Sequence, residues 1–177
     1  LHPDALDAPN RYGTLLDQQI AWFEETVGRR PSYVRNHGYL NDGYWRHANH
    51  WIRSRITWSA NLPGVDGLVL NGSLLPARLQ LEGCLTPHWS LLTPYGDGMM
   101  FALGLSGQEA ASRIEDHIEE IRMSGLPGLI TINLHPANVG STRPLHEVLH
   151  RLIGRNVLAW SLQQCAAWFE RRDASPL

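Results

Sequence analysis

The chain has 177 residues and a formal net charge of −2, a length that suits one domain with a substantial core. Its basic residues are scattered and form no continuous stripe, so no nucleic-acid partner is expected and the predicted ligand is a small molecule or a neutral polymer. No apolar run approaches the roughly 20 residues of a membrane-spanning helix, so no membrane partner is expected either. All 15 basic residues are arginine, which excludes Schiff-base catalysis and a phosphate-loop lysine.

The cysteines and the N-terminus bear on the cellular compartment. Cys84 and Cys165 are too far apart for a thiolate metal motif, and two cysteines define no disulfide framework. The chain begins at Leu1 and shows no signal-peptide pattern. A cytoplasmic location is therefore favoured, with secretion left open because the true N-terminus can lie further upstream. The whole range 1–177 is expected to form a single domain.

In the first third of the chain, helices and short strands alternate. Apolar residues recur at spacings of three and four over residues 14–27, which predicts a helix that ends at Gly28. Residues 33–35 and 56–60 are rich in β-forming side chains and predict strands. Between them, a second helix is predicted over about 41–52, capped by Asn41 or Asp42.

The middle of the chain, residues 67–104, is the least regular part. Short strands are predicted at 68–70 and 79–81. The segments 86–89 and 94–98 contain proline, glycine and aromatic residues, and predict a long loop. Because loops carry functional residues more often than scaffold elements do, this loop is a candidate contributor to a site.

The last part of the chain returns to regular alternation. Ser106 and Glu109 have the spacing of a capping box at the start of a helix over 106–124. A buried strand over 129–134, a helix over 143–152, a strand over 157–160 and a helix over 161–169 follow. This alternation predicts an α/β fold with a mainly parallel sheet. A complete (β/α) barrel needs about 250 residues, whereas this chain holds only about five units, so any barrel would be incomplete.

The tripeptide Leu-His-Pro occurs at both ends of this pattern, as Leu1-His2-Pro3 and Leu134-His135-Pro136. Pro136 prevents the strand at 129–134 from continuing, so the imidazole of His135 is expected at the rim of the sheet. Ligands and catalytic groups gather at that rim in α/β folds. His135 is therefore the leading catalytic candidate, and Asn138 in the same loop is a candidate substrate contact.

Two further groups of residues are expected near the same rim. Arg35 and His37 follow a strand and lie two residues apart, which directs both to one side if the strand persists. Arginine suits the orientation of a carboxylate. His2 and Asp4 are both competent to bind a metal ion. Three histidines at strand ends predict one pocket.

Two other motifs have competing interpretations. In the predicted loop, His88 and Trp89 are candidate substrate contacts, since a tryptophan face stacks well on a sugar ring; Trp89 could equally anchor its own loop. His146 and His150 match the His-Glu-x-x-His string of zinc proteases. The short helix and its apolar residues favour ordinary packing there, and no third ligand follows in the next strand.

The order of these motifs resembles that of the polysaccharide deacetylase family of carbohydrate esterases. The resemblance covers most of the chain and rests on the opening Leu-His-Pro, the segment 28–38 with Arg35 and His37, the strand at 56–61, the second Leu-His-Pro, and the closing helix at 167–172. It implies a distorted (β/α) barrel. It also implies a metal-dependent hydrolase that removes an acetyl group from an N-acetylated sugar or cleaves a related small amide.

The resemblance also implies roles for individual residues. A divalent metal, commonly zinc, would polarise the amide carbonyl and activate water. His2 resembles a metal-binding histidine, Arg35 the arginine that orients an aspartate base, and His135 the histidine that protonates the leaving amine. The family's second metal histidine falls at Leu6 here, so Asp4 or His37 would have to replace it.

One departure from the family concerns the catalytic base. The strand that bears the aspartates should precede His2, and this numbering does not include it. A non-catalytic carbohydrate-binding or interaction domain with the same barrel is therefore the alternative function. The hydrolase hypothesis predicts that His2, Arg35, His37 and His135 converge in one pocket. The sequence makes no prediction of the oligomeric state.

Overall fold

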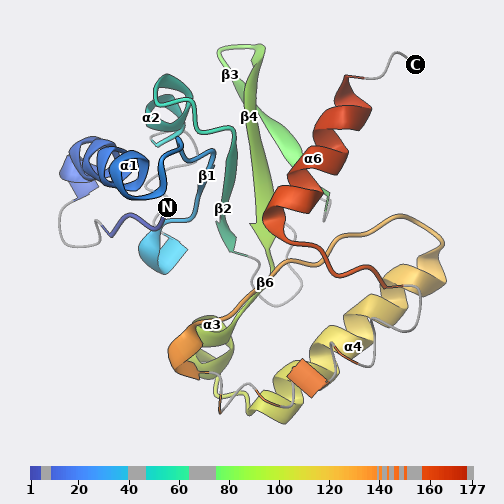
Figure 1. Ribbon diagram of the computed structural model, residues 1–177. Helices are drawn as coiled ribbons and strands as arrows, with labels where there is room; N and C mark the ends of the chain where they lie inside the picture. Colours follow the sequence, from blue (N-terminus) through green and yellow to red (C-terminus); the bar gives the residue numbers. More distant parts are fainter. Residues whose placement is uncertain are drawn as a thin grey trace.

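A computed structural model describes residues 1–4, 9–39, 47–63, 75–138, 140, 143, 146–147, 150 and 157–174 of the chain. Helices and strands alternate around two sheets, as Figure 1 shows. The larger sheet has four strands in the order β1-β2-β4-β3, and the smaller one pairs β5 with β6. The N-terminus lies beside β1, while the C-terminus lies beyond α6 on the opposite side of the view (Figure 1).

The four-stranded sheet is mainly parallel. β1 (Tyr33–Val34), β2 (Trp58–Pro63) and β4 (Cys84–Thr93) run in the same direction, and β3 (Ala77–Leu81) is antiparallel to β4. Tyr33 is paired with Trp58, which is paired in turn with Trp89. Because all three parallel strands point the same way, their carboxyl ends meet at one edge of the sheet.

Residues 1–3 extend this sheet beyond β1. The amino group of Leu1 donates to the carbonyl of Tyr33 at 3.0 Å, and the amide of Arg35 donates to the carbonyl of Leu1 at 2.9 Å. The amide of His37 then donates to the carbonyl of Pro3 at 2.8 Å. This alternation is the bonding pattern of a parallel pair. The first Leu-His-Pro segment therefore lies alongside the end of β1.

A well-packed core supports this edge. α1 (Tyr12–Val27), preceded by the 3-10 turn η1 (Pro9–Arg11), and α2 (Ala48–Arg53) lie on the β1 side of the sheet (Figure 1). Gly28 ends α1 in the left-handed conformation, with φ 72°. The residues buried between these elements are large and mostly apolar: Tyr12, Leu16, Ile20, Val34, Ala48, Trp51, Ile56 and Leu79.

The second sheet has a separate and smaller core. β5 (Tyr95–Gly96) pairs in parallel with β6 (Ile132–Asn133), so both strands end beside α3 (Asp97–Ala102) and the 3-10 turn η3 (Pro136–Asn138). α4 (Gly107–Ser124) contributes the buried residues Ala110, Ala111 and Ile114. The predicted capping box at Ser106 and Glu109 is confirmed.

The last helix connects the end of the chain to the four-stranded sheet. α6 (Leu162–Asp173) begins at a second capping box, formed by Ser161 and Gln164. The indole of Trp58 donates to the Glu170 carboxylate at 2.8 Å, and Arg78 pairs with Asp173 at 3.2 Å. These contacts join residues that are about a hundred positions apart in sequence.

The predicted α/β class and mainly parallel sheet are confirmed, whereas the described residues form no closed barrel. The prediction of a loop at 86–89 is wrong, because those residues lie in β4. In the first part of β4 the buried positions are the polar Thr86, His88 and Ser90, and the buried Leu91 and Leu92 come only near its end. Residues 84–90 therefore show no apolar alternation in the sequence.

Other elements differ in length. The strand predicted at 129–134 is reduced to Ile132–Asn133, and residues 157–160 belong to no strand. The helix predicted at 41–52 is described only as Ala48–Arg53. The strand predicted at 68–70 and most of the helix predicted at 143–152 lie outside the described residues. Among the described helices, none is both long and apolar enough to cross a membrane.

Candidate functional site

The position of the His2 ring depends on the next residue, Pro3. In the parallel pairing of residues 1–3 with β1, the amide of residue 3 would donate to the carbonyl of Arg35, but Pro3 has no N–H. The Nδ1 of His2 lies 2.8 Å from that carbonyl oxygen and takes the place of the missing donor. Since a carbonyl only accepts, Nδ1 carries the proton and Nε2 presents a lone pair.

That lone pair faces a second histidine. Nε2 of His2 lies 3.2 Å from Nδ1 of His37, the first residue of the 3-10 turn η2 (His37–Tyr39), and the two rings meet edge to face. On its far side, Nε2 of His37 lies 4.0 Å from the carboxylate of Asp4. Three of the predicted site residues, His2, Asp4 and His37, therefore lie together.

The surroundings of His2 lower the pKa of its imidazole. Desolvation is the largest effect on His2 and lowers the pKa of its imidazole, an effect partly opposed by the bond to the Arg35 carbonyl. The positive charges of Arg35, His37 and His135 lower the pKa of His2 further. The convergence of His135 and His2 in one pocket stays a prediction.

The turn from Arg35 to His37 is braced from below by a buried network. The main-chain N–H of Asn36 donates to Oδ1 of Asn61 at 2.6 Å. The side-chain Oδ1 of Asn36 accepts a hydrogen bond from the Tyr12 hydroxyl at 2.7 Å. That hydroxyl also accepts a hydrogen bond from the indole of Trp51 at 2.7 Å. Because these polar groups are buried, each bond is costly to lose. The network joins α1, α2 and β2 to the strand end that carries Arg35 and His37.

The other half of the site contains a residue that the sequence did not point out. Asp97, the first residue of α3, is fully buried and accepts four hydrogen bonds. Its donors are the amide of His135 at 2.6 Å, Nδ1 of His135 at 2.6 Å, the amide of Gly98 at 2.7 Å and the side-chain amide of Asn138 at 3.0 Å. Asp97 therefore positions both predicted residues of this loop.

The charge state of Asp97 follows from these bonds. Burial alone would raise the pKa of the carboxyl group. The hydrogen bonds from His135, Asn138 and Gly98 outweigh burial, and the net pKa is lowered. Asp97 is consequently an anion that holds the Nδ1–H of His135, while the His135 side chain remains 46% exposed. This leaves Nε2 as the ring nitrogen available for proton transfer.

Arg35 lies beside a cavity between the two halves of the site. The cavity has a volume of about 280 Å³. Its walls include Leu1, Arg35, Thr93, Asn133 and Leu162. Of the residues expected to converge in one pocket, Arg35 lines this cavity, whereas His2, His37 and His135 do not.

The facing nitrogens of His2 and His37 have the spacing of two zinc ligands. Ligands of a tetrahedral zinc ion at 2.0–2.1 Å lie about 3.3 Å apart, close to the 3.2 Å between the facing nitrogens. The carbonyl bond to Nδ1 of His2 is typical of metal-binding histidines. Asp4, however, faces the opposite nitrogen of His37, and the described residues include no group of three suitable side chains. The described residues therefore supply two ligands rather than a complete set, and zinc stays a prediction.

His88 does not occupy the place predicted for it. It is completely buried in β4, where Nδ1 donates to the Ile56 carbonyl at 2.7 Å and Nε2 lies 2.9 Å from the Ser59 hydroxyl. Its ring stacks on Trp51 at 4.9 Å. Burial lowers the pKa of His88 to about 4. The prediction of a substrate contact at His88 is wrong, because a buried strand residue is inaccessible to a ligand.

Trp89 takes a structural position as well. Its ring stacks on Trp58 at 5.4 Å and approaches Phe169 of α6 at 6.2 Å. These contacts favour the anchoring alternative over the predicted sugar contact. The interaction holds α6 against the sheet.

The alternative zinc-protease motif gains no support from the described residues. Glu147, which would be the base of such a site, pairs with Arg143 at 3.1 Å. No metal-binding group of three includes His146 or His150 within the part of the chain that the structure describes.

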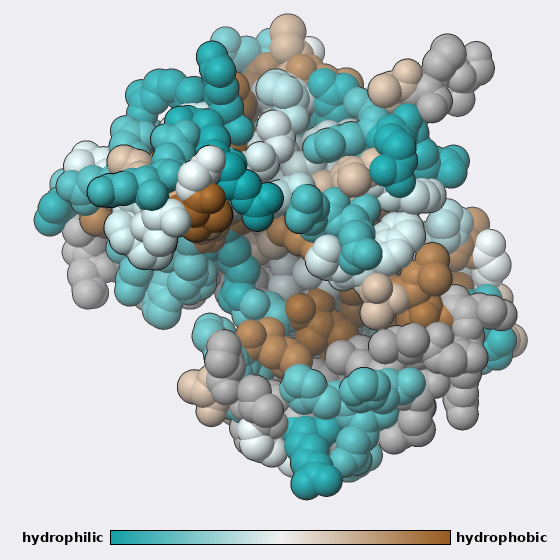
Figure 2. Space-filling view, in the orientation of Figure 1, coloured by the Kyte–Doolittle hydropathy of each residue, from teal (hydrophilic) through white to brown (hydrophobic). Residues whose placement is uncertain are grey.

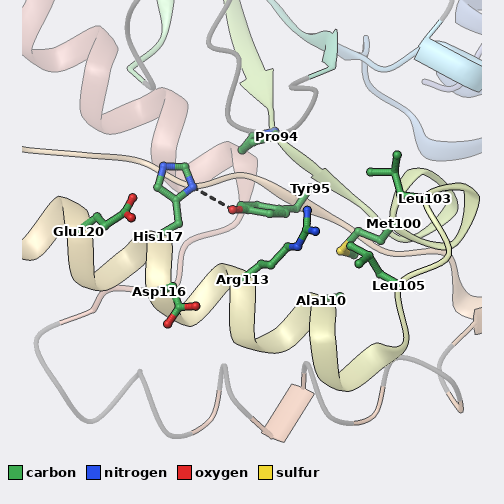
Figure 3. A pocket seen from close by; sticks show the side chains of 10 residues that line it. All are labelled: Pro94, Tyr95, Met100, Leu103, Leu105, Ala110, Arg113, Asp116, His117 and Glu120. Atoms are coloured by element: carbon green, nitrogen blue, oxygen red, sulfur yellow. Dashed lines mark hydrogen bonds between the residues drawn. The ribbon is translucent and has the colours of Figure 1, made fainter.

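A second hollow lies between β5, α3 and α4 (Figure 3). It has a volume of about 320 Å³, and the Tyr95 hydroxyl on its wall bonds to Nδ1 of His117 at 2.9 Å. Arg113 and Glu120 of α4 also line it (Figure 3). No residue lines both this hollow and the cavity at Arg35, so the two are separate.

Comparisons with known proteins agree with the fold. No family model matches the sequence, and no curated protein matches it either. A solved structure from Bordetella bronchiseptica, provisionally described as a polysaccharide deacetylase involved in O-antigen biosynthesis, is similar with a TM-score of 0.52 and 16% identity. The match covers 88% of this chain and 58% of that one, so the chain spans little more than half of its structural neighbour. At this identity the similarity shows a shared α/β fold.

Proposed function

We propose that this chain is part of a hydrolase of the polysaccharide deacetylase type. Its substrate would be an N-acetylated sugar, or a related small amide, from which an acyl group is removed. The observation that carries the proposal is the hydrogen bond between Nδ1 of His135 and the buried carboxylate of Asp97, together with the facing ring nitrogens of His2 and His37. The similarity to a structure described as a polysaccharide deacetylase supports it.

His135 would act as the general acid. In its protonated form, it would donate the Nε2 proton to the amide nitrogen as the C–N bond breaks, so that the amine leaves uncharged. Asp97 would remain ionised, keep the imidazole in one orientation and stabilise the imidazolium form. Asn138 donates to Asp97, so it would position the carboxylate rather than contact substrate.

The other half of the site would bind the acyl group and a metal ion. His2 and His37 would hold zinc through the facing Nε2 and Nδ1 atoms, and Asp4 would orient His37 from its far side. When bound, zinc supplies Lewis-acid polarisation of the amide carbonyl. Arg35 lines the adjacent cavity, where it could orient a carboxylate or the substrate carbonyl.

Acetate release from N-acetylchitotetraose, with zinc added, tests the proposal. His135→Gln is expected to lower the rate by about 10²- to 10⁴-fold, the usual contribution of a general acid. His150→Gln is the matched control, because His150 is an exposed histidine outside the site, and it should retain the rate.

Three outcomes would be informative. Equal rates for the wild-type protein and His135→Gln would remove His135 from the reaction. Absence of acetate release by the wild-type protein would contradict the hydrolase proposal. Tetramer binding without acetate release would favour the alternative of a non-catalytic carbohydrate-binding domain.

A further inference from the structure

The hollow between β5, α3 and α4, which we call the α4 hollow, has an apolar floor. Met100 and Ala110 of the smaller core are buried there, and Tyr95 and Leu105 pack against that core. Leu103, directly after α3, lies on the wall and is 52% exposed. Figure 2 shows hydrophobic surface on the part of the molecule that contains α3 and α4, in the orientation of Figure 1.

The size of the α4 hollow limits what it can hold. Its volume of about 320 Å³ is at the lower end of the range for small-molecule sites. Apolar side chains at the floor and on the wall favour a ligand with an apolar body, because such a ligand removes their surface from water. The hollow therefore suits one small apolar group.

Polar side chains of α4 add a charged rim to this floor. Arg113, Asp116, His117 and Glu120 recur at spacings of three and four, which places them along one face of the helix. The Tyr95 hydroxyl bonds to Nδ1 of His117 at 2.9 Å, and this bond joins β5 to α4 across one wall of the hollow. A ligand with a charged head and an apolar body can use both the rim and the floor.

Arg113 is the charged group placed closest to the floor along α4. It lies three residues after Ala110, on the next turn of the same helix face. Figure 3 shows the Arg113 side chain extending from α4 toward Tyr95, whereas the Asp116 side chain extends away from it. The guanidinium therefore supplies the head-group charge beside the apolar floor.

The acidic residues of the rim leave room for an anion at Arg113. Glu120 lies seven residues after Arg113, which is two helical turns or about 10 Å along the axis. At physiological ionic strength this separation exceeds the Debye length of about 8 Å, so repulsion between an anion at Arg113 and the exposed Glu120 carboxylate is largely screened. The planar fork of arginine also matches the two oxygens of a carboxylate.

We propose that the α4 hollow binds a small apolar carboxylate. The apolar chain packs on Met100, Leu103 and Leu105, and the carboxylate accepts hydrogen bonds from the Arg113 guanidinium. The hollow shares no lining residue with the cavity at Arg35, so this inference goes beyond the proposed function and does not rest on it.

Calorimetric titration of the 177-residue protein with octanoate and with octylammonium tests the proposal. The two probes share an apolar chain and differ in the sign of the head group. Octanoate should bind saturably, and octylammonium should bind at least about tenfold more weakly, the range expected for loss of a charged hydrogen bond. Imidazole ¹⁵N signals of His117 should shift as octanoate saturates the protein, because this ring lines the hollow.

Variants of the head-group and chain contacts locate the bound octanoate. Arg113→Gln should weaken octanoate binding by about tenfold, and Arg113→Lys by less, because lysine keeps the charge and loses the fork. Leu103→Asn should weaken it by about fivefold through the loss of apolar contact. Leu103 and Arg113 are both exposed, so the fold should be retained, and far-ultraviolet circular dichroism checks this.

Arg122→Gln provides the matched control. Arg122 is an exposed arginine of the same helix that pairs with Glu119 at 2.7 Å and does not line the hollow. Its replacement removes the same charge from α4 as Arg113→Gln does. Octanoate affinity should be unchanged.

Three results would overturn the proposal. The first is a wild-type protein that does not bind octanoate saturably. The second is octylammonium binding as tight as octanoate binding, which would assign the preference of the rim to Asp116 and Glu120. The third is unchanged octanoate affinity in both Arg113→Gln and Leu103→Asn, which would place the bound octanoate elsewhere. Acetate release by the wild-type protein is a separate measurement, so failure here leaves the hydrolase proposal standing.

Discussion

The two Leu-His-Pro segments have the same sequence but hold their histidines by opposite means. His2 is fixed by a main-chain carbonyl, that of Arg35, in a region braced by a buried network of aromatic and amide side chains. His135 is fixed by a buried carboxylate, Asp97, in a region whose core is built from smaller residues. Burial lowers the pKa of His2 despite the bond to the Arg35 carbonyl, which suits the ring to binding a cation. An anionic acceptor fixes the proton on Nδ1 of His135 and leaves Nε2 facing outward, the arrangement that the proposed general acid needs.

This contrast shows that the partner of a histidine decides its chemistry more than its local sequence does. The experiments below disturb first the carboxylate that holds His135, then the network under His2, and last the proline that frees the Arg35 carbonyl for His2.

The largest effect is expected for Asp97→Asn. Asparagine directs an NH₂ group at donors that now bond to a carboxylate, so His135 loses its orientation. Acetate release should fall by about 10²- to 10⁴-fold. Asp173→Asn, which alters an exposed carboxylate paired with Arg78, should leave the rate unchanged. Unaltered activity in Asp97→Asn would show that the carboxylate does not act through His135.

Acidification should lower the free energy of unfolding by protonating His88, whose ring stacks on Trp51 of the buried network. The pKa of folded His88 is about 4, below its ordinary value of 6.5, so folding favours the neutral ring. The stability contribution is complete above pH 6.5 and is lost as the pH falls from 6.5 to 4, a total of about 3 kcal/mol. Urea unfolding at pH 7, 5.5 and 4 measures this slope, and His88→Gln should reduce it. An equal slope in both proteins would assign the acid sensitivity to other groups.

Tyr12→Phe should weaken the brace beneath Arg35 and His37. The substitution leaves the indole N–H of Trp51 and Oδ1 of Asn36 without their buried partner, which costs about 2 kcal/mol of unfolding free energy. Tyr95→Phe is the control, since its hydroxyl bonds to His117 in a partly buried position and its loss should cost less. Equal costs in urea unfolding would indicate that the buried network adds no special stability.

The smallest effect is expected for Pro3→Ala. Alanine restores an amide N–H that can donate to the Arg35 carbonyl, as in an uninterrupted parallel pair, and so competes with His2. The Nδ1 bond of His2 should weaken, and zinc affinity should fall by about two- to fivefold. Imidazole ¹⁵N NMR reports the protonated nitrogen directly. An unchanged His2 spectrum would mean that the proline has no part in holding the ring.

Much of the fold could be predicted from local signals. The helix that ends at Gly28, the capping box at Ser106 and the alternation of helix and strand follow from spacing and side-chain chemistry within one turn or one strand. The grouping of His2, Asp4 and His37 could also be predicted, because the ends of neighbouring parallel strands meet at one edge.

The rest of the site could not be predicted in this way. The first part of β4 was missed because its buried positions, Thr86, His88 and Ser90, are polar. Burial of such residues becomes acceptable only when partners such as the Ile56 carbonyl and the Ser59 hydroxyl are present. Asp97 lies 38 residues from His135, and nothing local distinguishes it from an ordinary turn aspartate. The signal that could have indicated Asp97 was its place directly after the short strand β5, which belongs to the same sheet as β6.

By itself, the sequence determined that histidines stand at two proline-terminated strand ends, that these 177 residues supply no lysine, and where the main helices begin or end. Only the tertiary structure decided which acceptor each histidine meets: the Arg35 carbonyl for His2 and the Asp97 carboxylate for His135. The physical reason is that the charge and tautomer of an imidazole depend on groups within hydrogen-bond distance, and packing brings those groups together from distant parts of the chain.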